Sequence, residues 1–294
     1  MKKTTSGVFR CLSWLTRLAL LLLLLPAAVQ AQFNYTTNKG TITITQYTGP
    51  GGDVTIPDTI NGLPVTSIGD EAFYDCISLT GVTIPNSVTS IGYGPFEYCT
   101  GLTNIIMGTN MTSIGWYAFA YCTSLVSVTI PNSMTYIPTR AFLDCASLAS
   151  VTIPANVTVF YPGAFLNCTG LEKIYFRGNA PGINDSDVFG GDTNTIVYHV
   201  PGKSGWSSTL GGRPTALWLP QLQIRDHSFG VQTNQFGFNI NWASGQVVVV
   251  EACTDLADPL WSPLQTITLA ADSTYFSDPH STHYPSLFYR VHSP

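Results

Sequence analysis

The sequence predicts a mainly β protein: a solenoid of 23-residue repeats with an N-terminal β-hairpin cap, followed by a small β-sandwich. Phenylalanine, cysteine and leucine each recur five times at intervals of 23 residues, starting at Phe73, Cys76 and Leu79. A fixed period of this length is typical of stacked repeats, which bury their apolar faces only against one another. Period-two alternation before the repeats indicates a hairpin, and the 23-residue period is absent beyond residue 219.

Residues 1–31 have the organisation of a secretory signal peptide. Four basic residues precede or flank an apolar core at residues 18–25, and Val29, Gln30 and Ala31 form a small-residue cleavage site. A retained membrane anchor is the alternative, but the apolar run is short for a bilayer span. We therefore expect cleavage after Ala31 and export of the protein.

The charge of the chain argues against a nucleic-acid partner. Loss of the signal removes four of the twelve basic residues and none of the 17 acidic ones, which leaves a net charge of −9. Such a chain repels phosphate backbones, and it contains no basic stripe that could follow one. No second apolar stretch is long enough to span a membrane, so we expect no transmembrane segment after signal removal.

Residues 32–60 are predicted to form the N-terminal β-hairpin cap. Apolar and polar residues alternate through Thr41–Thr45, between turn residues at 38–40 and 49–52. The segment Val54-Thr55-Ile56-Pro57 already has the ending of the later repeats. A first coil needs such a cover, because its strand edge and core face are otherwise exposed.

Residues 61–177 are predicted to form the repeats. Each unit has a strand of the type Leu79-x-x-Val82-x-Ile84, a turn beginning at proline, a second short extended piece, and a tight apolar turn ending in Ala-Phe-x-x-Cys. Proline suits the strand end because it cannot donate to the sheet. The Phe, Cys, Leu and Val/Ile columns are expected to point inward, in a solenoid from about residue 61 to residue 201.

Residues 178–219 are predicted to hold a degenerate last repeat, the C-terminal cap and a linker. Asp192 replaces the cysteine and Thr195 the leucine, which we interpret as a coil that faces water on one side. Residues 202–218, rich in Gly and Ser, are interpreted as the end of the cap and the linker.

Residues 220–294 are predicted to form a small β-sandwich. Five extended segments are separated by turn residues; they are residues 236–242, 246–253, 263–269, 274–276 and 287–291. Several short strands in a segment of this length are typical of fibronectin-III-like or immunoglobulin-like sandwiches.

The repeats resemble the BspA-like bacterial leucine-rich repeat proteins, whose units follow the plan Cys-x-x-Leu-x-x-Ile-x-Ile-Pro…Ile-Gly-x-x-Ala-Phe. Departures are local, such as Pro95 in an alanine position and Phe160 in an isoleucine position. The resemblance implies a leucine-rich repeat solenoid in a bacterial protein that is secreted or attached to the cell surface, and that mediates protein-protein recognition or adhesion. Segments 251–256, 261–264 and 288–291 are similar to the fibronectin-III-like modules of secreted bacterial proteins.

The five repeat cysteines are expected to be buried, reduced thiols. They occupy one repeat position and therefore form a column with neighbours about 4.8 Å apart. This spacing permits a disulfide, which is the alternative, but side chains of stacked coils point in parallel rather than toward each other. Metal binding is disfavoured, because a one-dimensional ladder in an apolar core offers no tetrahedral site.

Other candidate chemistry has a plainer interpretation in each case. His280 and His283 with Asp278 could form an acid-base or metal cluster, but they lie among loop residues. Residues 184–187 with Asp192 lack the glycine and glutamate spacing of a calcium loop, so turn formation is favoured. No nucleophile elbow or recurring carboxylate pair is present. We therefore expect no catalytic, cofactor-binding or metal-binding residues, no cofactor, and no enzymatic activity.

The outward positions of the repeats carry hydroxyl groups and aromatic rings that suit contact with a protein or glycan ligand. The candidate binding residues lie near the predicted turns and are Tyr93, Tyr98, Trp116, Tyr117 and Tyr121. Tyr98 and Tyr121 are one repeat apart and should stack. The alternative is that these are ordinary surface residues. We expect a monomeric binding protein on a cell surface or matrix; the alternative function is a carbohydrate-binding or carbohydrate-active surface protein.

Overall fold

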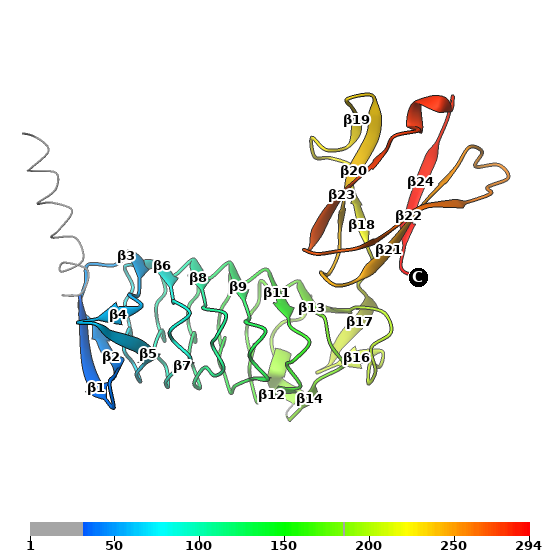
Figure 1. Ribbon diagram of the computed structural model, residues 1–294. Coiled ribbons are helices and arrows are strands. Elements are labelled where there is room, and N and C mark those ends of the chain that lie inside the picture. The colour runs from blue at the N-terminus through cyan, green and yellow to red at the C-terminus, as the bar shows by residue number, and fades with distance from the viewer. Residues whose placement is uncertain (1–31, 185) are drawn as a thin grey trace, which may run out of the picture.

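The computed structural model describes residues 32–184 and 186–294, and it confirms the predicted fold class (Figure 1). The chain forms a β-solenoid with a second β-domain at its C-terminal end. Among the described residues, helix is confined to two short 3₁₀ segments, η1 (Ser186–Phe189) and η2 (Ser281–His283). The predicted signal segment, residues 1–31, lies outside the described residues.

A nine-stranded sheet runs along one side of the solenoid and takes one strand from each coil. Its order is β16-β17-β15-β13-β11-β9-β8-β6-β3. The bounds are β3 Gly52–Thr55, β6 Leu79–Thr83, β8 Asn104–Ile106, β9 Ser127–Thr129, β11 Ser150–Ile153, β13 Lys173–Phe176, β15 Ile196–His199, β16 Thr209–Leu210 and β17 Arg213–Leu217. All neighbours are parallel except the β16–β17 pair. The sheet extends beyond the predicted range 61–201, because strands without the repeat period join it at both ends.

Shorter parallel pairs form on the opposite side of each coil. One three-stranded sheet contains β10 (Tyr136–Ile137), β12 (Val159–Phe160) and β14 (Gly182–Ile183). Earlier in the chain, β7 (Ser90–Ile91) pairs with β5 (Leu63–Ile68). These pairs are the second extended pieces that the sequence predicts in each unit.

The inward columns form one continuous core. Phe73, Phe96, Phe119, Phe142 and Phe165 are fully buried, as predicted. Neighbouring rings of this column stack with centroids 4.8–5.4 Å apart. Each coil therefore completes the burial of the coil before it. We number the coils 1 to 5 after these phenylalanines.

The N-terminal end is covered by the antiparallel hairpin of β1 (Phe33–Asn38) and β2 (Thr41–Tyr47). Strand β2 pairs in parallel with β5, and β4 (Thr59–Ile60) pairs with the other edge of β5. Phe33 and Tyr47 pack on Phe73, with ring centroids 6.3 and 5.1 Å away. The hairpin thus supplies the aromatic contacts that a preceding coil would give.

The C-terminal end of the solenoid is also covered, so the prediction of a water-facing last coil is wrong. Asp192 and Thr195 are each only 1% exposed. The cap strands β16 and β17 extend the sheet past this coil, and Trp206 and Leu210 pack against the core. Residues 202–218 are therefore a packed cap, because their apolar side chains bury the end of the stack.

The C-terminal domain, residues 220–294, contains two antiparallel sheets around one core. The first holds β18 (Gln221–Gln223), β19 (Gly230–Gln232), β20 (Gln235–Asn241) and β23 (Ser273–Asp278). The second holds β21 (Val247–Cys253), β22 (Ser262–Thr268) and β24 (Phe288–His292). Their facing side chains, including Phe238, Ile240, Val248, Val250 and Phe276, are buried.

The two parts meet in a defined joint. Arg177 of the solenoid donates through Nη2 to both carboxylate oxygens of Asp272, at 2.6 and 2.5 Å, and through Nη1 to Ser244 Oγ at 2.5 Å. The Trp242 indole donates to the carbonyl of Trp218 at 2.7 Å. These contacts hold the C-terminal domain above the nine-stranded sheet (Figure 1).

Candidate binding surface

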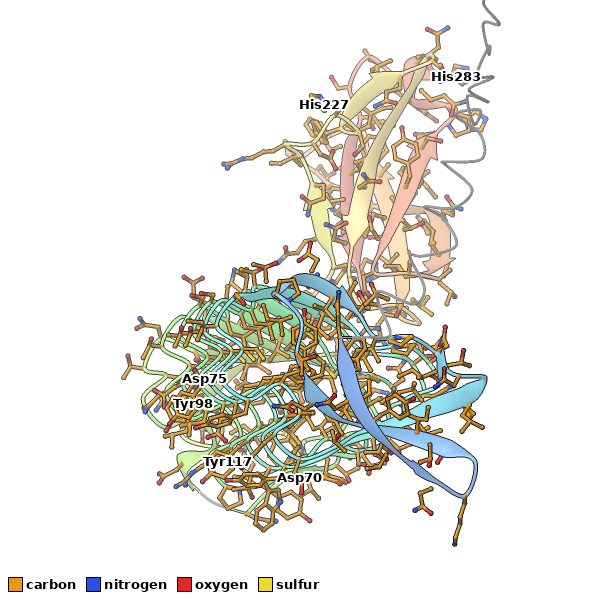
Figure 2. All side chains as sticks on the ribbon, turned by 90° about the vertical axis from the view of Figure 1, so that its left-hand side faces the viewer. Asp70, Asp75, Tyr98, Tyr117, His227 and His283 are labelled. Atoms are coloured by element: carbon orange, nitrogen blue, oxygen red, sulfur yellow. The ribbon has the colours of Figure 1, made fainter. Side chains whose placement is uncertain are left out.

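The five predicted binding residues come together on one flank of coils 1 to 3. Figure 2 shows Tyr98 and Tyr117 on the side of the solenoid away from the protruding hairpin and clear of the C-terminal domain. Tyr74, which the sequence analysis missed, joins them because it directly follows Phe73 in the equivalent turn of coil 1. We call this set the aromatic ridge: Tyr74, Tyr93, Tyr98, Trp116, Tyr117 and Tyr121.

Rings of the ridge contact one another between coils. Tyr98 and Tyr121 stack with centroids 4.4 Å apart and planes within 1°, which confirms the predicted stack. Tyr74 meets Tyr98 edge-on at 5.6 Å, and Tyr93 meets Tyr117 at 5.6 Å in a tilted arrangement. Trp116 is the most exposed ring of the set, at 60%. The ridge is therefore an ordered array rather than a scatter of surface rings.

The tyrosines are held in an unusual backbone conformation. In every coil, the residues two before and two after the buried phenylalanine have positive φ. Gly, Asp or Asn, which tolerate this region, fill five of these ten positions. Glu71 and Arg140 occupy two others, and Tyr98, Tyr117 and Tyr121 occupy the remaining three with φ of 63°, 58° and 59°. A left-handed conformation costs a bulky residue about 1–2 kcal/mol.

Hydrogen bonds between coils impose this conformation. The Tyr98 amide donates to Ala120 O at 3.0 Å, and the Tyr121 amide donates to Leu143 O at 2.7 Å. The Tyr117 amide donates to Thr139 O at 3.2 Å. Because the ladder fixes each backbone, it also fixes the direction of each ring. Local strain of this kind concentrates at functional sites.

The charges of the repeats gather at the same turns. Six charged residues lie between residues 61 and 170, and all of them adjoin the buried phenylalanines: Asp70, Glu71, Asp75, Glu97, Arg140 and Asp144. Figure 2 shows Asp70 and Asp75 beside the labelled tyrosines. Asp70 Oδ1 accepts a hydrogen bond from the Tyr93 amide at 2.7 Å. The Arg140 guanidinium donates to Tyr117 Oη at 2.5 Å and lies 5.7 Å from the ring centroid.

Glu97 is the buried acid of the ridge, at 9% exposed. Burial, and then the negative charge of Glu71, raise the pKa of its carboxyl group. Within residues 32–184 and 186–294, no hydrogen bond or ion pair is found for its carboxylate. A Cβ on Gly94 would lie 2.8 Å from Glu97 Oε2, so the carboxylate lies over the glycine that follows Tyr93.

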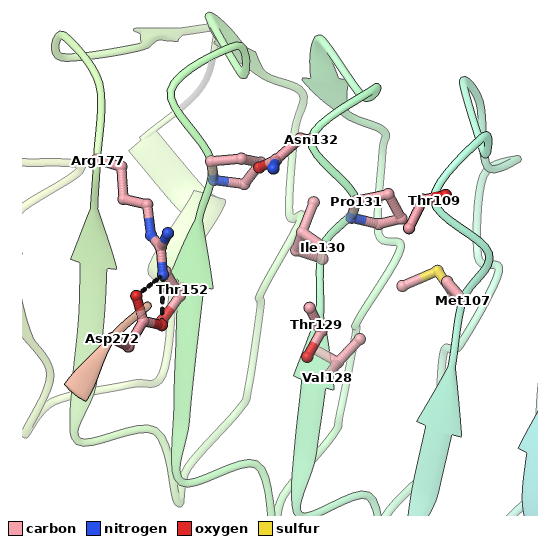
Figure 3. A pocket seen from close by; sticks show the side chains of 11 residues that line it. Met107, Thr109, Val128, Thr129, Ile130, Pro131, Asn132, Thr152, Arg177 and Asp272 are labelled. Carbon is pink, nitrogen blue, oxygen red and sulfur yellow. Dashed lines mark hydrogen bonds and ion pairs between the residues drawn. The ribbon is translucent and has the colours of Figure 1, made fainter. Parts of the chain in front are cut away.

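The outward face of the nine-stranded sheet is a second surface with shallow hollows. It has a hollow of about 330 Å³ beside Asp53 and another of about 300 Å³ near the C-terminal domain. Figure 3 shows the second hollow, where Arg177 and Asp272 close one end and Thr129 and Thr152 lie on its floor. On the other side of the coils, the hydroxyl of Thr112 donates to the carbonyl of Thr89 at 3.1 Å. The proton of this hydroxyl is therefore already used within the solenoid.

The remaining candidate clusters have structural partners. Asp278 is 4% exposed; its carboxylate accepts from Tyr289 Oη at 2.9 Å and from the His280 amide at 2.8 Å. His280 and His283 lie around η2, at the surface of the C-terminal domain. Of the predicted calcium-like residues, Asp185 lies outside the described residues. Throughout the described ranges, no three His, Cys, Asp or Glu side chains come together as a metal site.

The fold and the candidate surface together define a class: a repeat solenoid that displays ordered side chains on the outside of its coils. Residues 64–194 match the family described as BspA type leucine rich repeat region, in six copies. This repeat region therefore belongs to the BspA-type leucine-rich repeat family. A comparison with curated proteins finds no match. No helix among the described residues is long and apolar enough to cross a membrane.

Three solved structures of bacterial repeat proteins are similar to this chain. A leucine-rich repeat protein of T. pallidum is 35% identical over 50% of this chain and 83% of its own, with a TM-score of 0.42. A leucine-rich cell surface protein of Faecalibacterium prausnitzii A2-165 is 25% identical over 72% of this chain and 57% of its own, with a TM-score of 0.46. A leucine-rich repeat protein of Bacteroides capillosus is 28% identical over 50% of this chain and 95% of its own, with a TM-score of 0.35.

Proposed function

We propose that this protein is a secreted or surface-attached bacterial binding protein that recognises another protein through the aromatic ridge and so mediates adhesion. The observation that carries this proposal is the placement of three tyrosines in left-handed positions on one exposed flank. Coil 5 has Gly163 and Asn167 at the corresponding positions, so the fold itself does not require tyrosine there. A role of the tyrosine rings in binding would explain why these positions keep a strained left-handed backbone that the fold does not require of tyrosine.

The other parts of the chain have supporting roles in this proposal. Residues 1–31 direct export, and the C-terminal domain, similar in sequence to fibronectin-III-like modules, acts as a spacer or attachment module. The joint at Arg177 and Asp272 orients the solenoid relative to this module. The protein acts as a monomer and needs no cofactor.

A glycan is the second candidate ligand, favoured by the 60% exposed indole of Trp116. Sugar rings stack on open aromatic faces, but Tyr98 and Tyr121 turn one face toward each other at 4.4 Å. The ridge therefore offers mainly ring edges and hydroxyl groups, which suit a protein surface better.

The test compares matched variants on two panels, one of immobilised extracellular-matrix proteins and one glycan array. The ridge variant carries Trp116→Ala and Tyr117→Ala, and the control carries Ile106→Ala and Thr129→Ala on the exposed sheet face. The ridge variant should bind its protein target at least about tenfold more weakly, since aromatic residues dominate such interfaces. Equal binding by wild type and the ridge variant would contradict the proposal, and loss restricted to the glycan array would favour the second candidate.

A further inference from the structure

We propose that the aromatic ridge binds a basic polypeptide segment, one rich in arginine or lysine, with Glu97 as its central acceptor. This inference rests on the proposed function and names the chemistry of its partner. Three observations carry it: the segregation of charge, the unpaired carboxylate of Glu97, and a guanidinium that already contacts the ridge.

The charge of the repeats is concentrated on this flank. Five of the six charged residues between residues 61 and 170 are acidic, so the turns of coils 1 to 4 carry a net charge of −4. The sheet face and the other sides of these coils carry no charged residue in this range. Such a field attracts a polycation and orients it along the ridge before contact.

Glu97 supplies the specific acceptor. The residue is only 9% exposed, but its carboxylate oxygens still reach solvent, and no hydrogen bond or ion pair is found for them among the described residues. The negative charge of Glu97 contributes to raising the pKa of both Tyr74 and Tyr93, after desolvation, so it acts on both sides of the ridge. An accessible carboxylate that no protein group engages is a free acceptor, and a guanidinium or ammonium group of a ligand would donate charge-assisted hydrogen bonds to it.

The protein itself shows how a guanidinium sits on this surface. Arg140 donates to Tyr117 Oη and lies over the same ring, at the end of the ridge farthest from Glu97 along the chain. Tyr74, Tyr93 and Tyr98 offer equivalent hydroxyls and ring surfaces around Glu97, where the described residues place no cation. Cation–π contacts and carboxylates together favour arginine and lysine side chains over a bare metal ion, which aromatic rings do not coordinate.

The test measures fluorescence anisotropy with three labelled peptides of one length: Gly-Ser-Arg repeats, the same repeats with lysine, and the same repeats with citrulline, a neutral isostere of arginine. The arginine and lysine peptides should bind wild type, and binding should weaken as salt is raised to physiological strength. Citrulline should reduce affinity by about tenfold or more, because the charge is lost and the shape is kept.

Matched variants assign the binding to the ridge. Glu97→Gln should weaken binding of the arginine peptide at least about fivefold. Glu172→Gln, the same charge change at an exposed position just before β13, should leave the affinity within about twofold of wild type. The exposed pair Glu71→Gln and Asp75→Asn is a second variant that does not disturb a buried group. Equal binding of the arginine and citrulline peptides, or an unchanged affinity in both ridge variants, would overturn the inference.

Two further outcomes separate this inference from the proposed function. If spermine displaces the labelled arginine peptide with the same affinity per positive charge as the unlabelled peptide, the ridge binds polyamines and the assignment to a polypeptide fails. If the Trp116 and Tyr117 variant loses its target on the protein panel while no basic peptide binds, the proposed function stands and only the charge assignment fails.

Discussion

Cysteine in this solenoid acts as a hydrogen-bond donor between coils. The Sγ of Cys99 donates to Phe73 O at 3.0 Å, and the Sγ of Cys122 donates to Phe96 O at 3.2 Å. The six cysteines of the described residues are free thiols. Burial raises the pKa of Cys99 to about 12, so the reactive thiolate is scarce at neutral pH.

Cys76 differs from the other four because no repeat coil precedes it. It is only half-buried, so the expectation of a uniformly buried column is wrong at its first member. Titration of residues 32–294 with a thiol reagent should detect Cys76 alone in the folded protein and six thiols after denaturation without reductant. Cys76→Ser should abolish the native signal; two or four thiols after denaturation would show that neighbouring coils are cross-linked.

The left-handed tyrosines give a second prediction at the residue scale. Tyr117→Gly should be more stable than Tyr117→Ala by about 1 kcal/mol, although glycine destabilises most backbone positions relative to alanine. Both variants lose the ring and its contact with Arg140, so the difference isolates the backbone. Urea unfolding of both proteins measures it. A Tyr117→Ala protein as stable as Tyr117→Gly would show that residue 117 is not left-handed.

Sequence periodicity predicts five of the six members of the ridge, all except Tyr74, but not their backbone conformation. Gly94 and Gly163 occupy the repeat position of Tyr117, and Asn167 occupies that of Tyr98 and Tyr121; these residue types are the sequence signal for a left-handed backbone there. The burial of Glu97 is not predictable from the repeat pattern, because it depends on the carboxylate lying against Gly94 within its own turn.

The last coil and its cap behave as one element, and Asp192 lies between them. Burial raises the pKa of the Asp192 carboxyl to about 7, while nearby Arg213 lowers it. Both carboxylate oxygens are buried without a hydrogen-bond partner in the described part of the chain. In the unfolded chain this pKa is about 4. The folded state therefore favours the protonated form, and its contribution to stability is complete below pH about 4 and is lost as pH rises toward about 7.

Asp192→Asn removes this titration while keeping the shape of the protonated acid. The variant should gain stability over wild type by at least about 1 kcal/mol at pH 8, and the gain should shrink as pH falls to 5. Melting temperatures of both proteins across this range measure it. A difference that is constant with pH would show that Asp192 is ionised in the folded protein at all these values.

At the element scale, strands of the C-terminal domain are predicted to within a few residues, whereas β18 and β19 are missed because they are short and lack alternation. The error at the last coil has a physical reason. The substitution of Asp192 for cysteine suggests exposure, but the cap that covers it has no repeat period and is recognisable only by apolar residues such as Trp206 and Leu210.

At the scale of the whole molecule, the sequence indicates two parts but not how they are joined. Arg177 and Asp272 are 95 residues apart in the chain, and neither spacing nor composition connects them. The ring of Tyr175 lies 4.7 Å from the Trp218 ring and is half-buried, because the chain turns into the C-terminal domain above it. Contacts of this kind arise only when the complete solenoid places its last coils beside the second domain.

The joint leads to a prediction that small-angle scattering can measure. Arg177 makes three hydrogen bonds across the joint and its side chain is 22% exposed, so Arg177→Ala removes the main polar contact and leaves the tryptophan contacts and the packing of Val200 in the core of the C-terminal domain. The variant should have a larger radius of gyration and a broader distance distribution than wild type, because domains move relative to one another unless their interface restrains them. Arg290→Ala is the matched control, since it breaks an arginine–carboxylate pair with Glu251 inside the C-terminal domain. If Arg177→Ala and Arg290→Ala both scatter as wild type does, the contacts of Val200, Trp218 and Trp242 are sufficient to hold the two parts together.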